Sequence, residues 1–180
     1  MNPSSPFAFH PLARLLHWLM ALLILAMLFV GVSMVVDLSP RHTVLVSLHK
    51  AIGLALLVLV LVRIAVRLML PHPPLPSDLP PWQRLAAGAS HLMLYALMLA
   101  MPLIGWGMLS AGGYPLPLQL PALLPHDLEL YAVLRRAHGW LAYVLFATVL
   151  VHLGAASVHA LVRRDSVMRS MWPGPVRRDQ

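Results

Sequence analysis

Four long apolar stretches constrain this chain more than any other feature. Each has roughly 20 residues or more, which is long enough for a helix to cross a hydrocarbon core about 30 Å thick. Only 11% of the 180 residues are charged, whereas 59% are hydrophobic, and so apolar a chain lacks the polar surface that a water-soluble domain needs. We therefore predict an all-α integral membrane protein, a four-helix bundle that forms a single membrane domain over residues 1–180. Its spans are expected over about residues 17–36, 47–70, 88–109 and 137–162.

The segments around these stretches lack helix-forming character. No basic region or small-residue cleavage site precedes the first stretch, so we expect a retained helix rather than a signal peptide. The segments on either side of the third stretch are rich in proline, which cannot continue a helix. We expect both of them to be loops.

Arginine and lysine are distributed unevenly over the two ends of the predicted spans. One end carries Arg14, Arg63, Arg67, Arg84, Arg163, Arg164, Arg169, Arg177 and Arg178. The other end carries only Arg41, Lys50, Arg135 and Arg136. Because cytoplasmic loops of membrane proteins carry an excess of basic residues, we predict that both termini and the loop between the second and third spans are cytoplasmic. The net charge of +7 then reflects orientation in a lipid membrane rather than binding to nucleic acid.

The chain has no cysteine but ten histidines. Without thiolates, the protein cannot form disulfides, iron–sulfur clusters, thiolate zinc sites or covalently attached c-type haem. Any bound metal would therefore be held by nitrogen, oxygen or thioether ligands. The six carboxylates all lie outside the predicted spans, which disfavours a catalytic zinc site built from histidine and carboxylate.

Four histidines fall into two layers of matching depth. His49 and His138 share the outer level, and His17 and His152 share an inner level. At 100° per residue, His152 lies within about 40° of His138 and His159 within about 20° of His152 on the fourth helix, so all three face one side. Ionisable side chains at membrane depth are functional by default, and a b-type haem iron takes two imidazoles from facing helices. The alternative for any single histidine is an interfacial side chain hydrogen-bonded to a headgroup or a carbonyl.

The stretches around these histidines carry a family resemblance. They read RLLHWLMALL, SLHKAIG, SHLMLYALMLAMPLIG, RRAHGWLAYVLF and LVHLGAASVHALVRRD, with VRIAVRLMLPHPP at the end of the second span. No single stretch is specific. In this order and spacing, however, the chain resembles the bacterial cytochrome b561 family of four-helix dihaem membrane cytochromes over nearly its whole length.

The resemblance implies two haem b groups. Their iron ligands would be His17 and His152 near the inner face, and His49 and His138 near the outer face. Well-characterised family members oxidise superoxide and pass the electron through both haems to ubiquinone. We therefore expect an oxidoreductase, a superoxide oxidase, in the bacterial inner membrane.

The resemblance also implies a ubiquinone site on the cytoplasmic side, where the positions matching His91 and His159 would contact the quinone. A quinone accepts hydrogen bonds, and it takes up protons when it is reduced. Imidazole suits this role because it can donate both a hydrogen bond and a proton near neutral pH.

Basic residues surround the predicted outer haem. Arg41, Lys50, Arg135 and Arg136 would steer superoxide, a small anion, toward the haem edge. The same residues would suit another periplasmic electron donor such as an acidic redox protein, the haem propionates, or simple extension of the side chains to the lipid interface.

Several alternatives stay open. Arg63 and Arg67, at the inner end of the second span, would pair either with propionates of the inner haem or with cytoplasmic headgroups. The chain as a whole would alternatively serve as a cytochrome b subunit for a partner dehydrogenase or hydrogenase. A haem-free membrane transport or structural protein is the remaining alternative.

Overall fold

The computed structural model describes residues 8–36, 39–76 and 78–172, and within these ranges every regular element is helical. The elements are α1 (Pro11–Val36), α2 (Arg41–Met69), α3 (Pro81–Ala111), the 3₁₀ helix η1 (Pro117–Gln119), α4 (Leu128–Ser157), the π-helix η2 (Val158–Arg163) that continues α4, and α5 (Ser166–Met171). Four helices, with α4 and η2 taken as one, are long and apolar enough to cross a membrane. The prediction of an all-α membrane four-helix bundle is confirmed.

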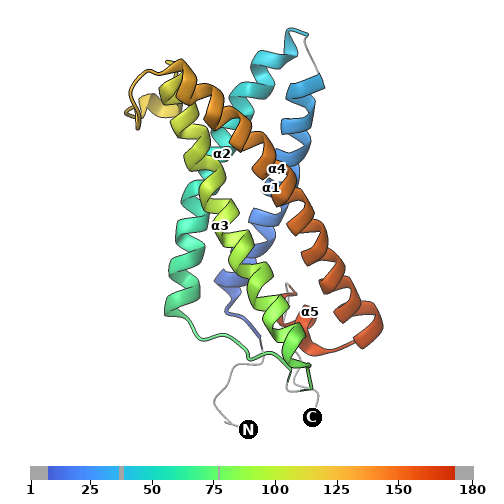
Figure 1. Cartoon of the computed structure of the whole chain (residues 1–180). Coiled ribbons are helices and arrows are strands. Elements are labelled where there is room, and N and C mark those ends of the chain that lie inside the picture. Colours follow the sequence, from blue (N-terminus) through green and yellow to red (C-terminus); the bar gives the residue numbers. More distant parts are fainter. Residues whose placement is uncertain (1–7, 37–38, 77, 173–180) are drawn as a thin grey trace.

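The four long helices alternate in direction, so that the start of α1, the α2–α3 loop and η2 lie at one end of the bundle (Figure 1). That end carries the larger group of arginines, and the opposite end carries Arg41, Lys50, Arg135 and Arg136. Arg177 and Arg178 lie outside the described residues, as do residues 1–7, where we expect no signal peptide. The cytoplasmic placement of the arginine-rich end stays a prediction.

All four long helices begin before the apolar stretches that predicted them, and α1 does so at Pro11. α2 begins at Arg41 and α3 at Pro81, whose ring suits the first turn of a helix. α4 begins after Asp127, whose carboxylate accepts the backbone N–H groups of Glu129 and Leu130 at 2.9 and 3.0 Å. Hydropathy marks only the part of a helix that lipid surrounds, whereas caps and prolines set where the helix starts.

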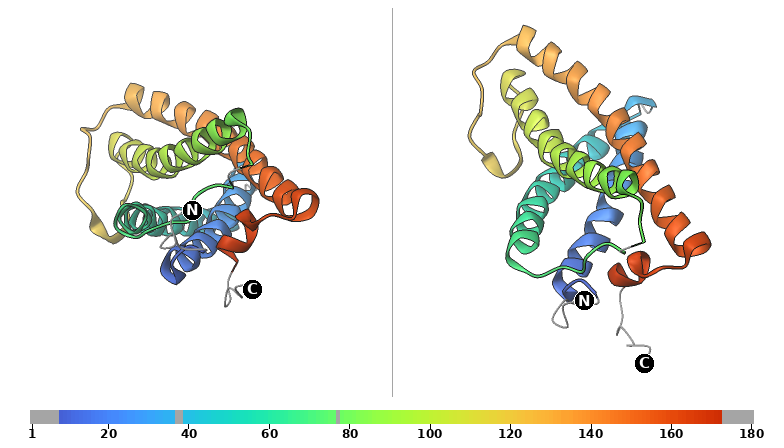
Figure 2. Two further views of the ribbon diagram at one scale, coloured as in Figure 1. Left: turned by 90° about the horizontal axis from the view of Figure 1, so that it is seen from below. Right: turned by 60° about the horizontal axis from the view of Figure 1, so that its bottom comes forward.

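The helices pack in sequence, α1 on α2, α2 on α3 and α3 on α4 (Figure 2). The buried centre is small, consisting of Met20 and Ile24 from α1 with Leu57 and Val60 from α2. Side chains from α3 and α4, such as Tyr95, cover this cluster. Packing is therefore concentrated in the middle of the bundle.

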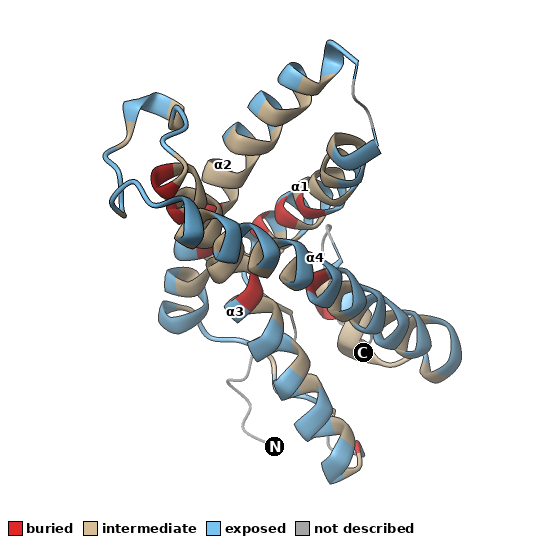
Figure 3. Cartoon of the chain, turned by 45° about the horizontal axis from the view of Figure 1, so that its top comes forward, coloured by how far each residue is buried: buried red, intermediate tan, exposed pale blue. Residues whose placement is uncertain are grey.

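Many large apolar side chains are exposed, and Figure 3 colours much of each long helix as exposed or intermediate. Phe29 is 74% exposed and Leu22 66% exposed, although both lie in the middle of an apolar helix. In water such a surface would aggregate, but lipid tails solvate it as well as a protein core does. This surface agrees with the membrane prediction.

The short helix α5 is bound to the first turns of α1. The indole N–H of Trp18 donates to the carbonyl of Met171 at 2.9 Å, and a guanidinium N–H of Arg14 donates to that of Trp172 at 2.7 Å. The backbone N–H of Phe9 donates to Ser170 at 3.1 Å. The segment after η2 is thus fixed beneath the arginine-rich end of the bundle.

Candidate functional site

His49 on α2 and His138 on α4 face each other in the half of the bundle opposite α5. Their ring centroids are 6.0 Å apart, and the ring planes are inclined at 67°. The Nδ1 atom of each ring is buried and has no hydrogen-bond partner among the described residues. A buried polar atom without a partner needs an explanation such as a bound ion or cofactor.

Two glycines on the other two helices leave space beside these rings. A Cβ atom added at Gly31 on α1 would lie 3.8 Å from Cε1 of His49, and one at Gly105 on α3 would lie 3.6 Å from Cε1 of His138. These are ordinary van der Waals distances, so each missing side chain leaves a gap against an imidazole. Gly31 and Gly105 were not among the residues predicted from the sequence, although small residues in membrane helices generally indicate close approach.

The second pair, His17 on α1 and His152 on α4, lies toward α5. Its ring centroids are 6.3 Å apart and the planes are inclined at 71°. His91 on α3 also approaches His152, with a centroid distance of 5.4 Å. The inner layer therefore contains three imidazoles, and the sequence had not predicted that His91 and His152 are neighbours.

The spacing of both pairs suits two axial ligands of one metal ion. A histidine nitrogen binds a metal at about 2 Å, so two imidazoles on opposite sides of one ion have centroids roughly 6 Å apart. Among the described residues, no three or more histidine, aspartate or glutamate side chains form a group that could hold a metal ion. An imidazole pair leaves tetrahedral zinc two ligands short, whereas haem iron receives four nitrogens from its porphyrin. The donor sets fit haem.

Arg63 contacts the inner pair directly. One guanidinium N–H donates to Nδ1 of His17 at 3.2 Å, and another donates to the carbonyl of Ala13 at 3.2 Å. Guanidinium is only a donor, so Nδ1 of His17 accepts in this arrangement. A histidine that binds a metal through Nε2 carries its proton on Nδ1. Metal binding by His17 through Nε2 therefore requires Arg63 to turn to another acceptor, for which a haem carboxylate is suited.

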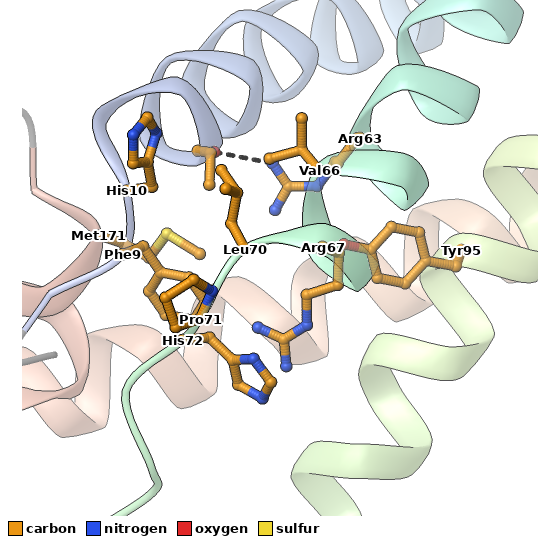
Figure 4. Close-up of a pocket in the computed structure, with 11 residues that line it drawn as sticks. Phe9, His10, Arg63, Val66, Arg67, Leu70, Pro71, His72, Tyr95 and Met171 are labelled. Carbon is orange, nitrogen blue, oxygen red and sulfur yellow. Dashed lines mark hydrogen bonds between the residues drawn. The ribbon is translucent and has the colours of Figure 1, made fainter. Parts of the chain in front are cut away.

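A small cavity of about 30 Å³ lies beside Arg63 and is lined by Arg67 as well (Figure 4). The guanidinium carbon of Arg63 lies 5.9 Å from the ring centroid of Tyr95, and that of Arg67 lies 5.3 Å from that of Phe9. Neither arginine pairs with a carboxylate in the described ranges. Two cations held against aromatic rings leave a positive cavity near His17, which suits an anionic group of the cofactor or of a lipid.

The structure does not bring His91 and His159 together as a ring pair. The ring contact of His91 is with His152. His159 lies in η2, where its Nδ1 is 2.6 Å from a carboxylate oxygen of Asp165. Asp165 was not predicted from the sequence, because neither helical nor strand periodicity relates two residues across a π-helix and the turn after it.

The four basic residues of the predicted outer rim differ in their surroundings. Lys50 donates to the carbonyl of Pro115 at 3.0 Å and thereby holds the α3–α4 loop. Arg135 reaches the hydroxyl of Tyr131 at 3.5 Å. Arg41, Arg135 and Arg136 are exposed. Lys50 thus has a structural contact, and the three arginines present their charge at the surface.

Comparison with known proteins gives a consistent result. Residues 8–174 match the family described as prokaryotic cytochrome b561. The chain is 29% identical over 175 residues to cytochrome b561 homolog 2 of Escherichia coli (strain K12), with 93% of each chain covered. Cytochrome b561 homolog 1 of the same organism is 25% identical over 138 residues, which cover 75% of this chain and 78% of the relative. A Yersinia pestis protein named "Probable superoxide oxidase CybB" is 29% identical over 130 residues, 70% of this chain and 73% of that protein.

Proposed function

The chain belongs to the prokaryotic cytochrome b561 family of haem b-binding, multi-pass membrane electron-transfer proteins, and we propose that it carries electrons through two haem b groups from the outer face of the bacterial inner membrane to ubiquinone. The observation that supports this most is the presence of two imidazole pairs of similar spacing at two depths, one between α4 and α1 and the other between α4 and α2. Membership of this family argues against a haem-free transport or structural protein.

We assign the outer haem to His49 and His138 and the inner haem to His17 and His152. Bound haem supplies reversible one-electron chemistry at iron. The chain's own residues hold the imidazoles at fixed separation, leave gaps at the glycines, and surround the pairs with apolar helices that keep water away. Arg63 would provide a cation for a haem carboxylate beside His17.

Quinone would accept electrons at the inner end, near His91 and His159. His91 lies against His152, so an acceptor beside His91 is next to the proposed inner haem. Both imidazoles have nitrogens suited to donating a hydrogen bond to a quinone oxygen. Hydrogen bonding to the quinone requires no carboxylate beside either imidazole. His159 nevertheless has one, Asp165.

We propose superoxide as the electron donor. The exposed guanidinium groups of Arg41, Arg135 and Arg136 raise the local concentration of a small anion at the outer face, and a relative bears the name of a superoxide oxidase. The same exposed charges favour a second candidate, an electron-transfer subunit that receives electrons from an acidic protein partner.

The ligand pairing is tested by single substitutions and the haem-to-protein ratio. Wild-type protein should hold two haems per chain. His49→Ala and His138→Ala should lose the same haem, because each removes one of the two imidazoles that would hold it, and His17→Ala and His152→Ala should lose the other. His91→Ala should keep both haems. The His91→Ala variant is decisive, because His91 as well as His17 lies close to His152. If His91→Ala lost the inner haem and His17→Ala kept it, His91 and not His17 would be the partner of His152.

The donor is tested with the purified dihaem protein alone. Superoxide should reduce both haems within the mixing time and support quinol formation, and Arg135→Gln with Arg136→Gln should slow this step and weaken its dependence on salt. Haem reduction by dithionite but not by superoxide would favour the subunit of a partner dehydrogenase or hydrogenase.

A further inference from the structure

The inner end of α4 departs from α-helical geometry. The chain forms the π-helix η2 over Val158–Arg163, and Arg164 then takes φ 52° and ψ 34°, a left-handed conformation unusual for a residue with a side chain. Short π-helical turns and left-handed non-glycine residues are found preferentially at functional sites, where surrounding contacts hold them. The distortion reverses the chain and returns Asp165 to His159.

The contacts made by this reversal converge on one carboxylate. Oδ2 of Asp165 lies 2.6 Å from Nδ1 of His159 and accepts from Nε of Arg163 at 3.2 Å. Oδ1 accepts the backbone N–H of Val167 at 3.1 Å, which caps α5. The side chains of His159 and Asp165 are only 19% and 16% exposed. The pair is therefore shielded from bulk water and held from several directions.

A second acid makes the outer part of the same network. Arg163 also donates to Oδ2 of Asp78 in the α2–α3 loop at 2.6 Å. The side chain of Asp78 is 69% exposed, and its described contact is with Arg163 rather than with His159. Asp78 and Asp165 thus share the arginine, but only Asp165 contacts the imidazole.

The protonation of the pair follows from its surroundings. Partial burial raises the pKa of the Asp165 carboxyl, but hydrogen bonds from His159, Val167 and Arg163 outweigh burial and hold that pKa below its usual value. Near neutral pH Asp165 is therefore a carboxylate, which can only accept. Nδ1 of His159 then carries a proton and donates a hydrogen bond to the carboxylate. Nε2 is therefore the nitrogen available to a ligand.

We propose that Asp165 is a positioning residue that holds the proton of His159 on Nδ1 and so directs Nε2 to exchange a proton with a quinone oxygen. This inference rests on the proposed quinone site. The arrangement resembles the general use of a carboxylate to orient a histidine and stabilise its charged form in acid–base chemistry.

Reduction of one quinone to its quinol takes two electrons, which arrive singly through the proposed haem chain, and two protons. One proton leaves Nε2 of a His159 imidazolium and forms an O–H bond on the quinone, and the neutral imidazole keeps its other proton on Nδ1 against Asp165. Hydronium from the cytoplasmic water then restores the proton on Nε2, and hydronium also protonates the second quinone oxygen.

The test compares Asp165→Asn with Asp78→Asn in the full-length dihaem protein. Each change replaces a carboxylate that binds Arg163 by an amide of the same shape, but only the first removes charge from His159. For Asp165→Asn we expect kcat for quinone reduction to fall at least about tenfold, because His159 loses the acceptor that holds its proton on Nδ1. Haem content and visible spectrum should not change. Asp78→Asn should stay within about twofold of wild type at every pH.

Histidine NMR of the same proteins provides a readout that needs no turnover, with His159→Gln used to assign the signal. Wild type should show the His159 proton on Nδ1, and Asp165→Asn should show a mixture of tautomers. Equal losses in the two acid variants, or an unchanged His159 tautomer in Asp165→Asn, would overturn the inference and leave quinone reduction by the wild type intact. A wild-type protein that never reduces quinone would overturn the proposed function, and the positioning role in quinone reduction with it.

Discussion

At the scale of single residues, the proposed site depends on imidazoles that face each other across helices. Each pair consists of one histidine from α4 and one from α1 or α2, with centroids 6.3 and 6.0 Å apart. Residues with no polar chemistry complete the outer site, since Gly31 and Gly105 leave space against the two rings. An absent side chain can thus be as important for cofactor fit as a ligand.

Substitution of Gly105 tests this view of the outer site. Gly105→Leu should lose most of the outer haem, because the larger side chain occupies the gap beside His138, while the inner haem is retained. Gly105→Ala should be tolerated, because its Cβ would stand at an ordinary contact distance of 3.6 Å from the ring.

Gly88→Leu provides the matched control, since it lies on the same helix and a Cβ there would meet nothing within 4 Å. The measurement is the visible spectrum and haem-to-protein ratio of each variant. Equal haem loss in Gly88→Leu and Gly105→Leu would show that α3 tolerates neither change and would remove the argument for a gap at the outer site.

At the scale of elements, α4 carries one ligand of each pair and η2, which continues it, carries His159. The position of α4 therefore affects every proposed site. Its start is set by Asp127 and its end by the π-helix η2 and Asp165. Both ends are thus determined by a carboxylate outside the apolar stretch. Lipid-facing leucines and valines determine that the helix exists, and the two acids determine where it begins and how it ends.

The cap at Asp127 leads to a prediction about stability. Asp127→Ala should destabilise the protein by about 1 kcal/mol, because two backbone N–H groups in the first turn of α4 lose their acceptor. Asp127→Ser should restore most of that loss. Thermal unfolding in detergent, followed by circular dichroism, measures both changes; a serine variant as unstable as the alanine variant would contradict a capping role.

At the scale of the whole molecule, the bundle has a small buried centre and an apolar exterior, which suits lipid as its solvent. The two ends differ in charge, and α5 is bound only to the arginine-rich end. If that end is cytoplasmic, the proposed quinone site faces the cytoplasm and the exposed arginines near the outer haem face the periplasm. Orientation therefore decides the direction in which the proposed electron path crosses the membrane.

The absence of cysteine from the sequence makes the orientation directly measurable. Single cysteines at Ala122, in the α3–α4 loop, and at Leu75, in the α2–α3 loop, would both be exposed to solvent. A membrane-impermeant maleimide should label Ala122→Cys in spheroplasts and Leu75→Cys only after lysis, because the basic end stays inside. The reverse pattern would place the proposed quinone site in the periplasm.

The fold could be predicted from the sequence because its determinants are local. Length and apolar composition specify each of the four helices without reference to the others, and residue intervals along a helix set the depth of His17, His49, His138 and His152. The layers of histidines were therefore visible before any tertiary contact was known.

Rotation of the helices about their axes and their crossing positions were decided only by the tertiary structure. These determine that the ring centroids of His91 and His152 lie 5.4 Å apart. They also determine that Gly31 and Gly105 approach the outer imidazole rings and that Arg63 reaches His17. Asp165 reaches His159 because the chain leaves α-helical geometry after Ser157, where intervals of 100° per residue no longer apply. Composition and depth follow from the sequence alone, whereas contacts across helices depend on packing that no single helix specifies.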